Sequence, residues 1–247
     1  MVDERTWPTD VLDYLETHRQ VFLAWELRHI GRENIKVNVA EFERASLGLR
    51  TALNPHTLHG YHCTRLTQPE IDAIILHGMH PSSATMLRSR IAALLDAGLI
   101  TALIAKRLSS ENQANAIFRS GMIWFCFYPP RNVTQQGVER FFRCWGGEAL
   151  YNLHERNPRV APILNRIGVP CLVEADVPIA SLEIHSYLDS KVARRFLVKR
   201  GLKTIESIDH EDRAKQPIPA GNIRRIIRFP ERDFIRLTRC DKWTPPL

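Results

Sequence analysis

Residues 60–79, with the sequence GYHCTRLTQPEIDAIILHGM, constrain the fold more than any other stretch of the chain. An apolar-edged strand over residues 61–66 leads through a polar turn into an amphipathic helix, which Gly78 closes. Thr67 is placed to cap this helix, because Glu70 follows three residues later and can bond back to the cap. The stretch therefore predicts a rigid strand-turn-helix unit that would hold polar side chains in fixed positions.

Helices and strands alternate irregularly along the rest of the chain. Helices are expected over residues 10–30, 39–53, 86–97, 99–108, 111–119, 135–145 and 190–200. Strands are expected over residues 122–128, 169–179 and 234–240. Residues 217–229 are expected to form a turn followed by a strand. Because few strand-helix-strand units occur, the fold class is predicted to be α+β. We expect one domain over residues 1–247, with 1–55 as a helical N-terminal layer and 56–247 as the α+β core.

Composition places the chain among ordinary globular proteins. No run reaches the roughly 18 apolar residues of a membrane helix, so no membrane contact is expected. The first residues, MVDERTWPTDVLDY, are acidic and mixed, unlike a signal peptide. The five cysteines are odd in number and widely spaced, which favours buried reduced thiols over a disulfide framework. These features predict a cytoplasmic protein.

The net charge of +7 is concentrated towards the C-terminus. Residues 190–242 hold 15 Lys or Arg against 7 Asp or Glu, a local charge of +8 that exceeds the total. Such a basic segment favours anionic partners, which include DNA, RNA, nucleotide phosphates and acidic protein surfaces. A solvated basic surface without a partner explains the same composition equally well.

His62 is the first candidate for a functional side chain. Strand alternation places His62 and Thr64 on one face, with Cys63 and Arg65 on the other. A polar pair on one strand face can hydrogen-bond a sugar hydroxyl or an amide. The alternative is a core histidine that bonds to a neighbouring backbone group, and spacing alone favours this alternative.

The order of residues in this stretch resembles the opening of the ADP-ribosyltransferase superfamily. The strand has the form aromatic-His-x-Thr and the helix ends in an apolar-His-Gly-Met step, as in bacterial DNA-modifying members and RNA 2′-phosphotransferases. The resemblance implies a compact mixed β core with flanking helices, and NAD as a substrate. It also implies that His62 binds the nicotinamide ribose, with Tyr61, Thr64 and Arg65 beside it.

The resemblance further implies an aromatic residue against the nicotinamide ring and a glutamate that stabilises the transition state. Tyr128, at the end of the strand MIWFCFY, is the expected stacking residue. Glu211 fits the glutamate by its order in the chain, because it precedes PIPAGNIRRI, which resembles the family's late Ile-Pro turn into a final strand.

Glu148, in WGGEALY, is the other candidate for the glutamate that stabilises the transition state, because its neighbours suit a ligand site. The two preceding glycines let the backbone approach a ligand closely, and Trp145 and Tyr151 supply ring faces for a base or for nicotinamide. The alternative for this motif is a helix end with a glycine stop and a packed tryptophan. The choice between Glu148 and Glu211 stays open.

Metal sites compete with this interpretation. Glu174 and Asp176 share one strand face and would suit Mg²⁺ in a nuclease whose basic region grips the phosphate backbone. No lysine follows at the offset that such sites use, and a polar strand face in water explains the pair as well. His77 and His80 are three residues apart, with His62 and Cys63 upstream, but no CxxC-type pair of zinc ligands occurs and Gly78 interrupts the helix between the two histidines, so we expect no bound metal. The glycine motifs of Rossmann folds and P-loops are also missing from the sequence.

Two function classes follow from the sequence. The leading hypothesis is an NAD-dependent ADP-ribosyltransferase that modifies nucleic acid or protein, in the manner of a bacterial toxin or defence effector. Its catalytic candidates are His62, Glu148 and Glu211. The alternative is a non-catalytic module that binds nucleic acid or a protein partner through the basic region.

Overall fold

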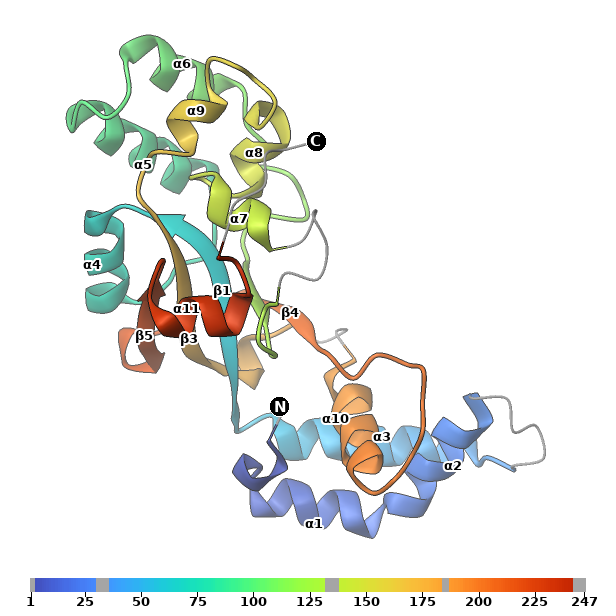
Figure 1. Cartoon of the computed structure of the whole chain (residues 1–247). Coiled ribbons are helices and arrows are strands. Elements are labelled where there is room, and N and C mark those ends of the chain that lie inside the picture. Colours follow the sequence, from blue (N-terminus) through green and yellow to red (C-terminus); the bar gives the residue numbers. More distant parts are fainter. Residues whose placement is uncertain (1–2, 30–35, 132–137, 184–186, 242–247) are drawn as a thin grey trace.

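The computed structural model describes residues 3–29, 36–131, 138–183 and 187–241. In this part of the chain, eleven α-helices accompany one five-stranded sheet, which confirms the α+β prediction (Figure 1). The helices are α1 (Thr9–Thr17), α2 (Arg19–His29), α3 (Val39–Leu53), α4 (Gln68–His77), α5 (Ala84–Asp96), α6 (Ala102–Ser110), α7 (Glu139–Arg143), α8 (Glu148–His154), α9 (Ala161–Leu164), α10 (Leu188–Lys199) and α11 (Arg232–Thr238). The strands are β1 (Thr57–Leu66), β2 (Ile123–Cys126), β3 (Val169–Pro178), β4 (Glu211–Ala214) and β5 (Ile223–Arg228). Short 3₁₀ turns are η1 (Glu4–Thr6), η2 (Ile179–Ser181) and η3 (Ala220–Asn222).

The sheet is antiparallel throughout, in the order β4-β2-β1-β3-β5. Its centre is the pair β1 and β3, which align over their whole length, so that the start of β1 lies opposite the end of β3. The resemblance implied a mixed β core, but no pair of described strands is parallel. A register shift at Glu174 and Ala175 interrupts the pairing of β3 with β5.

The two faces of the sheet have different covers. One face carries Val173 of β3 and packs beneath α4, whose Ile71 is buried in the same cluster. The opposite face carries Leu172 and packs against α7 and α11, through Phe142 and Phe234. Alternation along β1 and β3 therefore decides which side chains meet α4 and which meet α11.

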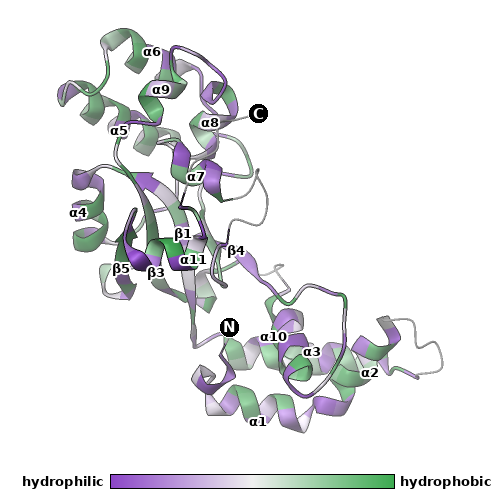
Figure 2. Cartoon of the chain, in the orientation of Figure 1, coloured by the Kyte–Doolittle hydropathy of each residue, from purple (hydrophilic) through white to green (hydrophobic). Residues whose placement is uncertain are grey.

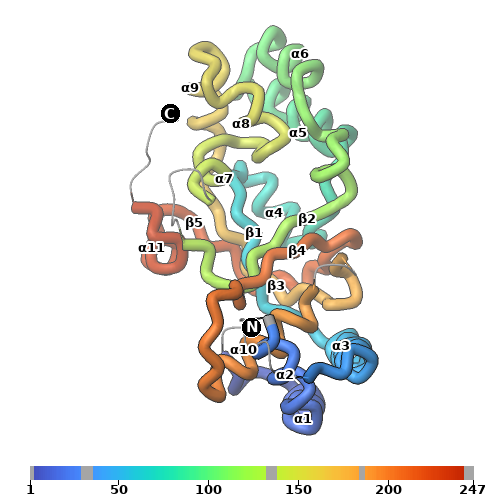
Figure 3. Tube along the Cα trace, turned by 90° about the vertical axis from the view of Figure 1, so that its right-hand side faces the viewer, coloured from blue at the N-terminus to red at the C-terminus, as the bar shows by residue number. Residues whose placement is uncertain are grey.

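The N-terminal helices form a layer at one end of the sheet (Figures 1 and 3). Helices α1, α2 and α3 pack against one another, and α10 joins them although it follows β3 in the chain. Phe196 of α10 is fully buried in the core that this layer shares with the sheet. Arg194 of α10 contacts Glu26 of α2 at 2.8 Å, which ties the late helix to the early ones. The layer predicted from residues 1–55 thus also includes residues 188–199.

A second group of helices lies at the other end of the sheet. Helices α5, α6, α8 and α9 enclose a separate apolar cluster, whose largest member is the fully buried Trp145. The apolar stretches of α6 and α9 are visible in Figure 2. The molecule is therefore elongated, with the sheet between two helical regions (Figure 1).

Several predicted elements differ from the structure. Residues 234–240 were expected as a strand, but most of them form α11, because Phe234, Leu237 and Thr238 are buried at helical spacing. The helix expected over 10–30 is two helices that meet at His18, and the last residue of the expected range, Ile30, lies outside the described residues. Tertiary burial therefore favours a helix in place of the strand expected over 234–240, and a local break at His18 divides the helix expected over 10–30.

Two further differences concern residues 111–128. The helix expected over 111–119 is absent, because the Asn112 side chain bonds the carbonyls of Leu108 and Ser109 and accepts the Ala114 N–H. Residues 122–128 were expected to be buried on both faces, but Trp124 is 42% exposed. The strand formed by this apolar run is therefore exposed at Trp124, and it is not buried on both faces.

The predicted turn after β1 is confirmed in its details. The Thr67 N–H donates to Glu70 Oε2 at 2.7 Å, which closes the capping interaction at the start of α4. Gly78 ends α4 with φ +79°, and the next residue, Met79, pairs with Ile218. The strand-turn-helix unit is thus fixed at both ends.

Gly78→Ala is expected to destabilise the fold strongly. A Cβ at this position would lie 2.1 Å from the Ile218 carbonyl oxygen, and the backbone conformation itself costs about 1–3 kcal/mol for a residue other than glycine. Gly98→Ala is the matched control, because Gly98 also has positive φ but no atom lies within 4 Å of the added Cβ. Chemical denaturation should show a larger loss for Gly78→Ala, and equal losses would contradict the close contact.

Candidate active site

A pocket of about 430 Å³ lies where the N-terminal layer meets the sheet. Its floor is the start of β1 and the end of β3, and its walls come from the segment before α1, the residues that follow β2, and α10. Polar groups converge on it from His59, Tyr61, Glu174, Asp176 and Arg224. This volume is in the range of pockets that hold small ligands.

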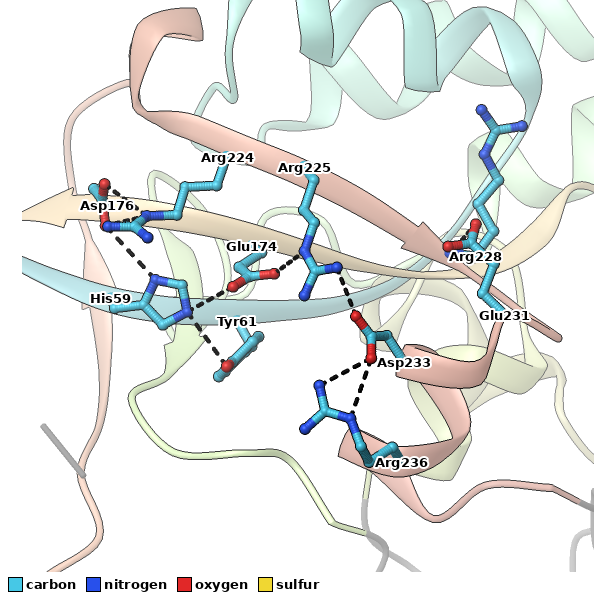
Figure 4. Close-up of polar contacts among 10 residues, drawn as sticks. All are labelled: His59, Tyr61, Glu174, Asp176, Arg224, Arg225, Arg228, Glu231, Asp233 and Arg236. Atoms are coloured by element: carbon cyan, nitrogen blue, oxygen red, sulfur yellow. Dashed lines mark hydrogen bonds and ion pairs between the residues drawn. The ribbon is translucent and has the colours of Figure 1, made fainter. Parts of the chain in front are cut away.

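Glu174 is the most buried acidic side chain of the pocket. The residue is 8% exposed, and its Oε1 lies 2.9 Å from Nε2 of His59. Nε of Arg225 donates to its Oε2 at 2.5 Å. Arg225 in turn contacts Asp233 of α11 at 2.7 Å, and Asp233 is also held by Arg236, so a chain of ion pairs leads from the pocket to α11 (Figure 4). Both carboxylate oxygens of Glu174 therefore have fixed partners.

Asp176 lies two residues further along the same strand face. Its two carboxylate oxygens accept from Nε of Arg224 at 2.9 and 2.8 Å, and its Oδ1 lies 3.6 Å from Nδ1 of His59. The ring of His59 is thus placed between the two carboxylates (Figure 4). The prediction that Glu174 and Asp176 share a face is confirmed, but Glu174 is buried rather than exposed to water.

Two tyrosines and a phenylalanine give the pocket aromatic surface. Tyr61 lies beside His59, with its hydroxyl 3.3 Å from Nε2, and burial together with the Glu174 charge raises the pKa of Tyr61. Tyr128 donates its hydroxyl hydrogen to Glu211 Oε1, and burial and this bond raise the pKa of Tyr128. Phe127 lines the pocket beside Tyr128. Flat apolar surface next to fixed charges suits a ligand with a ring and a polar sugar.

His62 lies on the opposite face of β1 and does not line this pocket. Its Nδ1 bonds the backbone carbonyl of Trp124 at 2.8 Å, and burial lowers its pKa although this bond opposes the shift. Thr64 shares that face, while Arg65 donates to the backbone carbonyls of Phe142, Ile167 and Gly168. The structure therefore separates His62 from the pocket, in the backbone-bonded arrangement considered as its alternative.

The WGGEALY motif lies among the helices at the far end of the sheet. Glu148 contacts Arg119 at 3.0 Å and accepts from the Tyr151 hydroxyl at 3.0 Å. Trp145 is fully buried and donates its Nε1–H to Glu70 Oε2 at 3.0 Å. None of these three predicted residues lines the pocket, whereas Glu211 lies one contact behind it, through Tyr128.

Acid is expected to weaken the fold through Glu70. Burial raises the pKa of Glu70, but Arg90 and the bond from Thr67 outweigh it and hold the pKa below the ordinary 4.5. A carboxyl group with a lowered folded pKa stabilises the fold above its unfolded pKa, and this contribution is lost as the pH falls below about 4.5. Unfolding free energies measured at decreasing pH should fall less steeply for Glu70→Gln than for the natural chain, and identical slopes would contradict this assignment.

Four residues that line the pocket were candidates in the sequence. Tyr61 and Tyr128 were expected to contact NAD, whereas Glu174 and Asp176 were considered as ligands of Mg²⁺. His59 and Arg224 were missed. His59 has the same strand parity as Tyr61, so alternation could have placed the two together. No local pattern distinguishes Arg224 from the other arginines near it.

The basic C-terminal region is largely paired with acidic groups. In the described part of residues 190–242, eight basic side chains form ion pairs with carboxylates, namely Arg194, Arg195, Arg200, Arg213, Lys215, Arg224, Arg225 and Arg236. These pairs reduce the free positive charge that a nucleic acid would meet. The described residues also contain no cluster of three or more His, Cys, Asp or Glu with the geometry of a metal site.

Comparison with known proteins gives no match: no family model, curated protein or solved structure is significantly similar to this chain. None of the described helices combines the length and hydrophobicity that crossing a bilayer requires. The site must therefore be interpreted from its own geometry.

Proposed function

We propose that this protein is an NAD-using enzyme of the ADP-ribosyltransferase type, which binds the dinucleotide in the pocket between the N-terminal layer and the sheet. The observation that carries the proposal is Glu174, a buried carboxylate with fixed partners on both oxygens that faces a ligand-sized pocket beside two tyrosines. In this proposal Glu174 takes the role that the sequence offered to Glu148 or Glu211.

The chemistry of nicotinamide loss suits this arrangement. When the bond between ribose and nicotinamide breaks, positive charge develops on the ribose, and a carboxylate that is already oriented stabilises it without reorganisation. Tyr61 and Tyr128 would contact the nicotinamide ring and the ribose. Arg224, at the pocket with its side chain 57% exposed, would contact a phosphate. The histidine beside Glu174 is His59 rather than His62, which departs from the pattern of the resembling family.

The ion pairs of Glu174 and Asp176 weigh against the magnesium nuclease. A metal ion would have to displace Arg224, Arg225 and the His59 ring from the two carboxylates. The proposed acceptors remain nucleic acid or protein, and the proposed setting a bacterial toxin or defence effector in the cytoplasm. Both rest on the resemblance alone.

Calorimetry with NAD and chromatography of released nicotinamide test the proposal. We expect NAD at up to about millimolar concentration to bind and raise the unfolding temperature, and free nicotinamide to accumulate slowly even without an acceptor. If NAD neither binds nor loses nicotinamide, the enzyme proposal fails. Salt-dependent binding of DNA or RNA under those same conditions would then favour the non-catalytic module.

A further inference from the structure

A second, smaller cavity of about 180 Å³ lies between the end of α3 and the start of α10, two helices that contact each other. An apolar cavity of about 150 Å³ is enough to hold benzene, whereas pockets for larger ligands begin at about 300 Å³. The cavity therefore suits a small molecule and excludes a dinucleotide. Leu53 and Ile179 line both this cavity and the larger pocket, so the two are neighbours. The apolar wall of the cavity consists of Leu53, Ile179, Ala180, Leu182 and Leu188.

Asp189, in the first turn of α10, brings a buried carboxylate to this cavity. The residue is 2% exposed, and its Oδ2 accepts no hydrogen bond from the described residues. Its Oδ1 accepts none either and, unlike Oδ2, is not fully enclosed by protein atoms. A buried carboxylate without hydrogen-bond donors destabilises a fold until a donor reaches it. A ligand with N–H groups in the cavity would supply that donor to Oδ1.

Arg50, near the end of α3, brings the opposite charge to the same cavity. Its Nε lies 3.1 Å from Oδ2 of Asp189, and its side chain is 45% exposed. Because Asp189 meets Nε, the two terminal nitrogens of the guanidinium stay available for a carboxylate, which arginine binds through two parallel hydrogen bonds. No side chain caps the start of α10, so the backbone N–H groups of its first turn also favour a negative group nearby.

The two charges together select the kind of ligand. A simple amine would meet the Arg50 guanidinium, and a simple carboxylate would meet Asp189. Glu183, the other acid at the cavity, is already paired with Arg213 at 3.1 Å and with Lys215 at 2.7 Å. A ligand that carries an ammonium group and a carboxylate on neighbouring atoms matches the adjacent Asp189 and Arg50.

We propose that this cavity binds an α-amino acid with an aliphatic side chain. The ammonium group donates to Oδ1 of Asp189, and the carboxylate accepts from the terminal nitrogens of Arg50. Both groups are attached to one carbon, as the 3.1 Å contact between their partners requires. The side chain packs against the leucines and Ile179 of the apolar wall. This proposal does not rest on the proposed function.

Calorimetry with L-leucine tests the proposal on the full chain. We expect one leucine to bind per chain and to raise the unfolding temperature without NAD. Isoamylamine lacks the carboxylate of leucine and isocaproate lacks its ammonium group, so each should bind about 10- to 100-fold more weakly, through the loss of one charged partner. The proposal is overturned if leucine does not bind at about 10 mM, or if either analogue binds as tightly.

Variants of the cavity separate a binding site from an ion pair that only joins two helices. Asp189→Asn and Arg50→Gln should each weaken leucine binding by about 10- to 100-fold. Ala180→Phe tests the site without changing a charge, because Ala180 is exposed and lines the cavity, so the ring should fill the space and block leucine. Arg44→Gln is the matched control, since Arg44 is exposed on the same helix, bonds the Ala40 carbonyl and does not line the cavity.

Two results among these variants contradict the proposal. One is a folded Asp189→Asn protein that binds leucine with the natural affinity, and the other is a folded Ala180→Phe protein that does so. An equal loss of leucine binding in Arg44→Gln would likewise place the ligand outside this cavity. Nicotinamide release is a separate measurement, so a chain that binds leucine but does not cleave NAD would refute only the proposed function.

Discussion

Glu174→Gln should reduce nicotinamide release from NAD by about 10²- to 10³-fold and leave NAD binding nearly unchanged. The amide has the same shape as the carboxylate but lacks the charge that would stabilise the ribosyl cation. The fold should survive, because Arg225 keeps its second partner, Asp233, at 2.7 Å. Release is measured chromatographically, with calorimetry to show that the dinucleotide still binds.

Two other glutamates make this experiment selective. Glu148 lies at the far end of the sheet and is bonded to Arg119 and Tyr151, so Glu148→Gln should keep full activity. Glu211→Gln should have an intermediate effect, because it changes the partner of the Tyr128 hydroxyl at the pocket. Loss of activity in Glu148→Gln with an active Glu174→Gln would place the reaction outside this pocket.

Trp145→Ala should cause the largest loss of stability among the candidate residues, about 3–5 kcal/mol in the free energy of unfolding. The indole is fully buried in the cluster formed by α5, α6, α8 and α9. Its Nε1–H donates to Glu70, and the Arg90 guanidinium lies 4.7 Å from its ring centre. Removal would leave a large cavity and take a hydrogen bond from Glu70, the partner of Thr67 in the cap of α4.

Denaturant unfolding of Trp145→Ala and Trp145→Phe separates these contributions. Phenylalanine fills most of the space but cannot donate to Glu70, so it should cost about 1–3 kcal/mol. NAD affinity of the folded Trp145→Phe protein should equal that of the natural chain, because Trp145 does not line the pocket. A specific loss of NAD binding in this variant would instead show that Trp145 contributes to the NAD-binding site.

Local chemistry made parts of the fold predictable. The cap of α4 depends on Thr67 and Glu70, which are three residues apart, and the structure contains the predicted bond. The cap of α5 depends in the same way on Ser83, whose hydroxyl accepts the Met86 N–H. Such features involve side chains and backbone within one turn, so the local sequence is enough to indicate them.

The pocket depends on pairings that no local pattern contains. Tyr61 faces Glu174 because β1 and β3 align in one particular register, across more than 100 residues of intervening chain. The sequence grouped Tyr61 with His62 as neighbours, although alternation sends them to opposite faces. For Glu174 it offered only a magnesium ion or water as the partner, since nothing in the sequence shows that Arg225 and His59 meet that carboxylate.

The position of α10 has a consequence for how the protein can be divided. Residues 56–247 on their own would keep α10 but lose the helices that cover it, so Phe196 and Leu197, both buried in the whole chain, would face water. The N-terminal helices on their own would in turn lack Arg194, which pairs with Glu26. A fragment cut at residue 55 would therefore be prone to aggregation, and the two pieces would have to be produced together to complement each other.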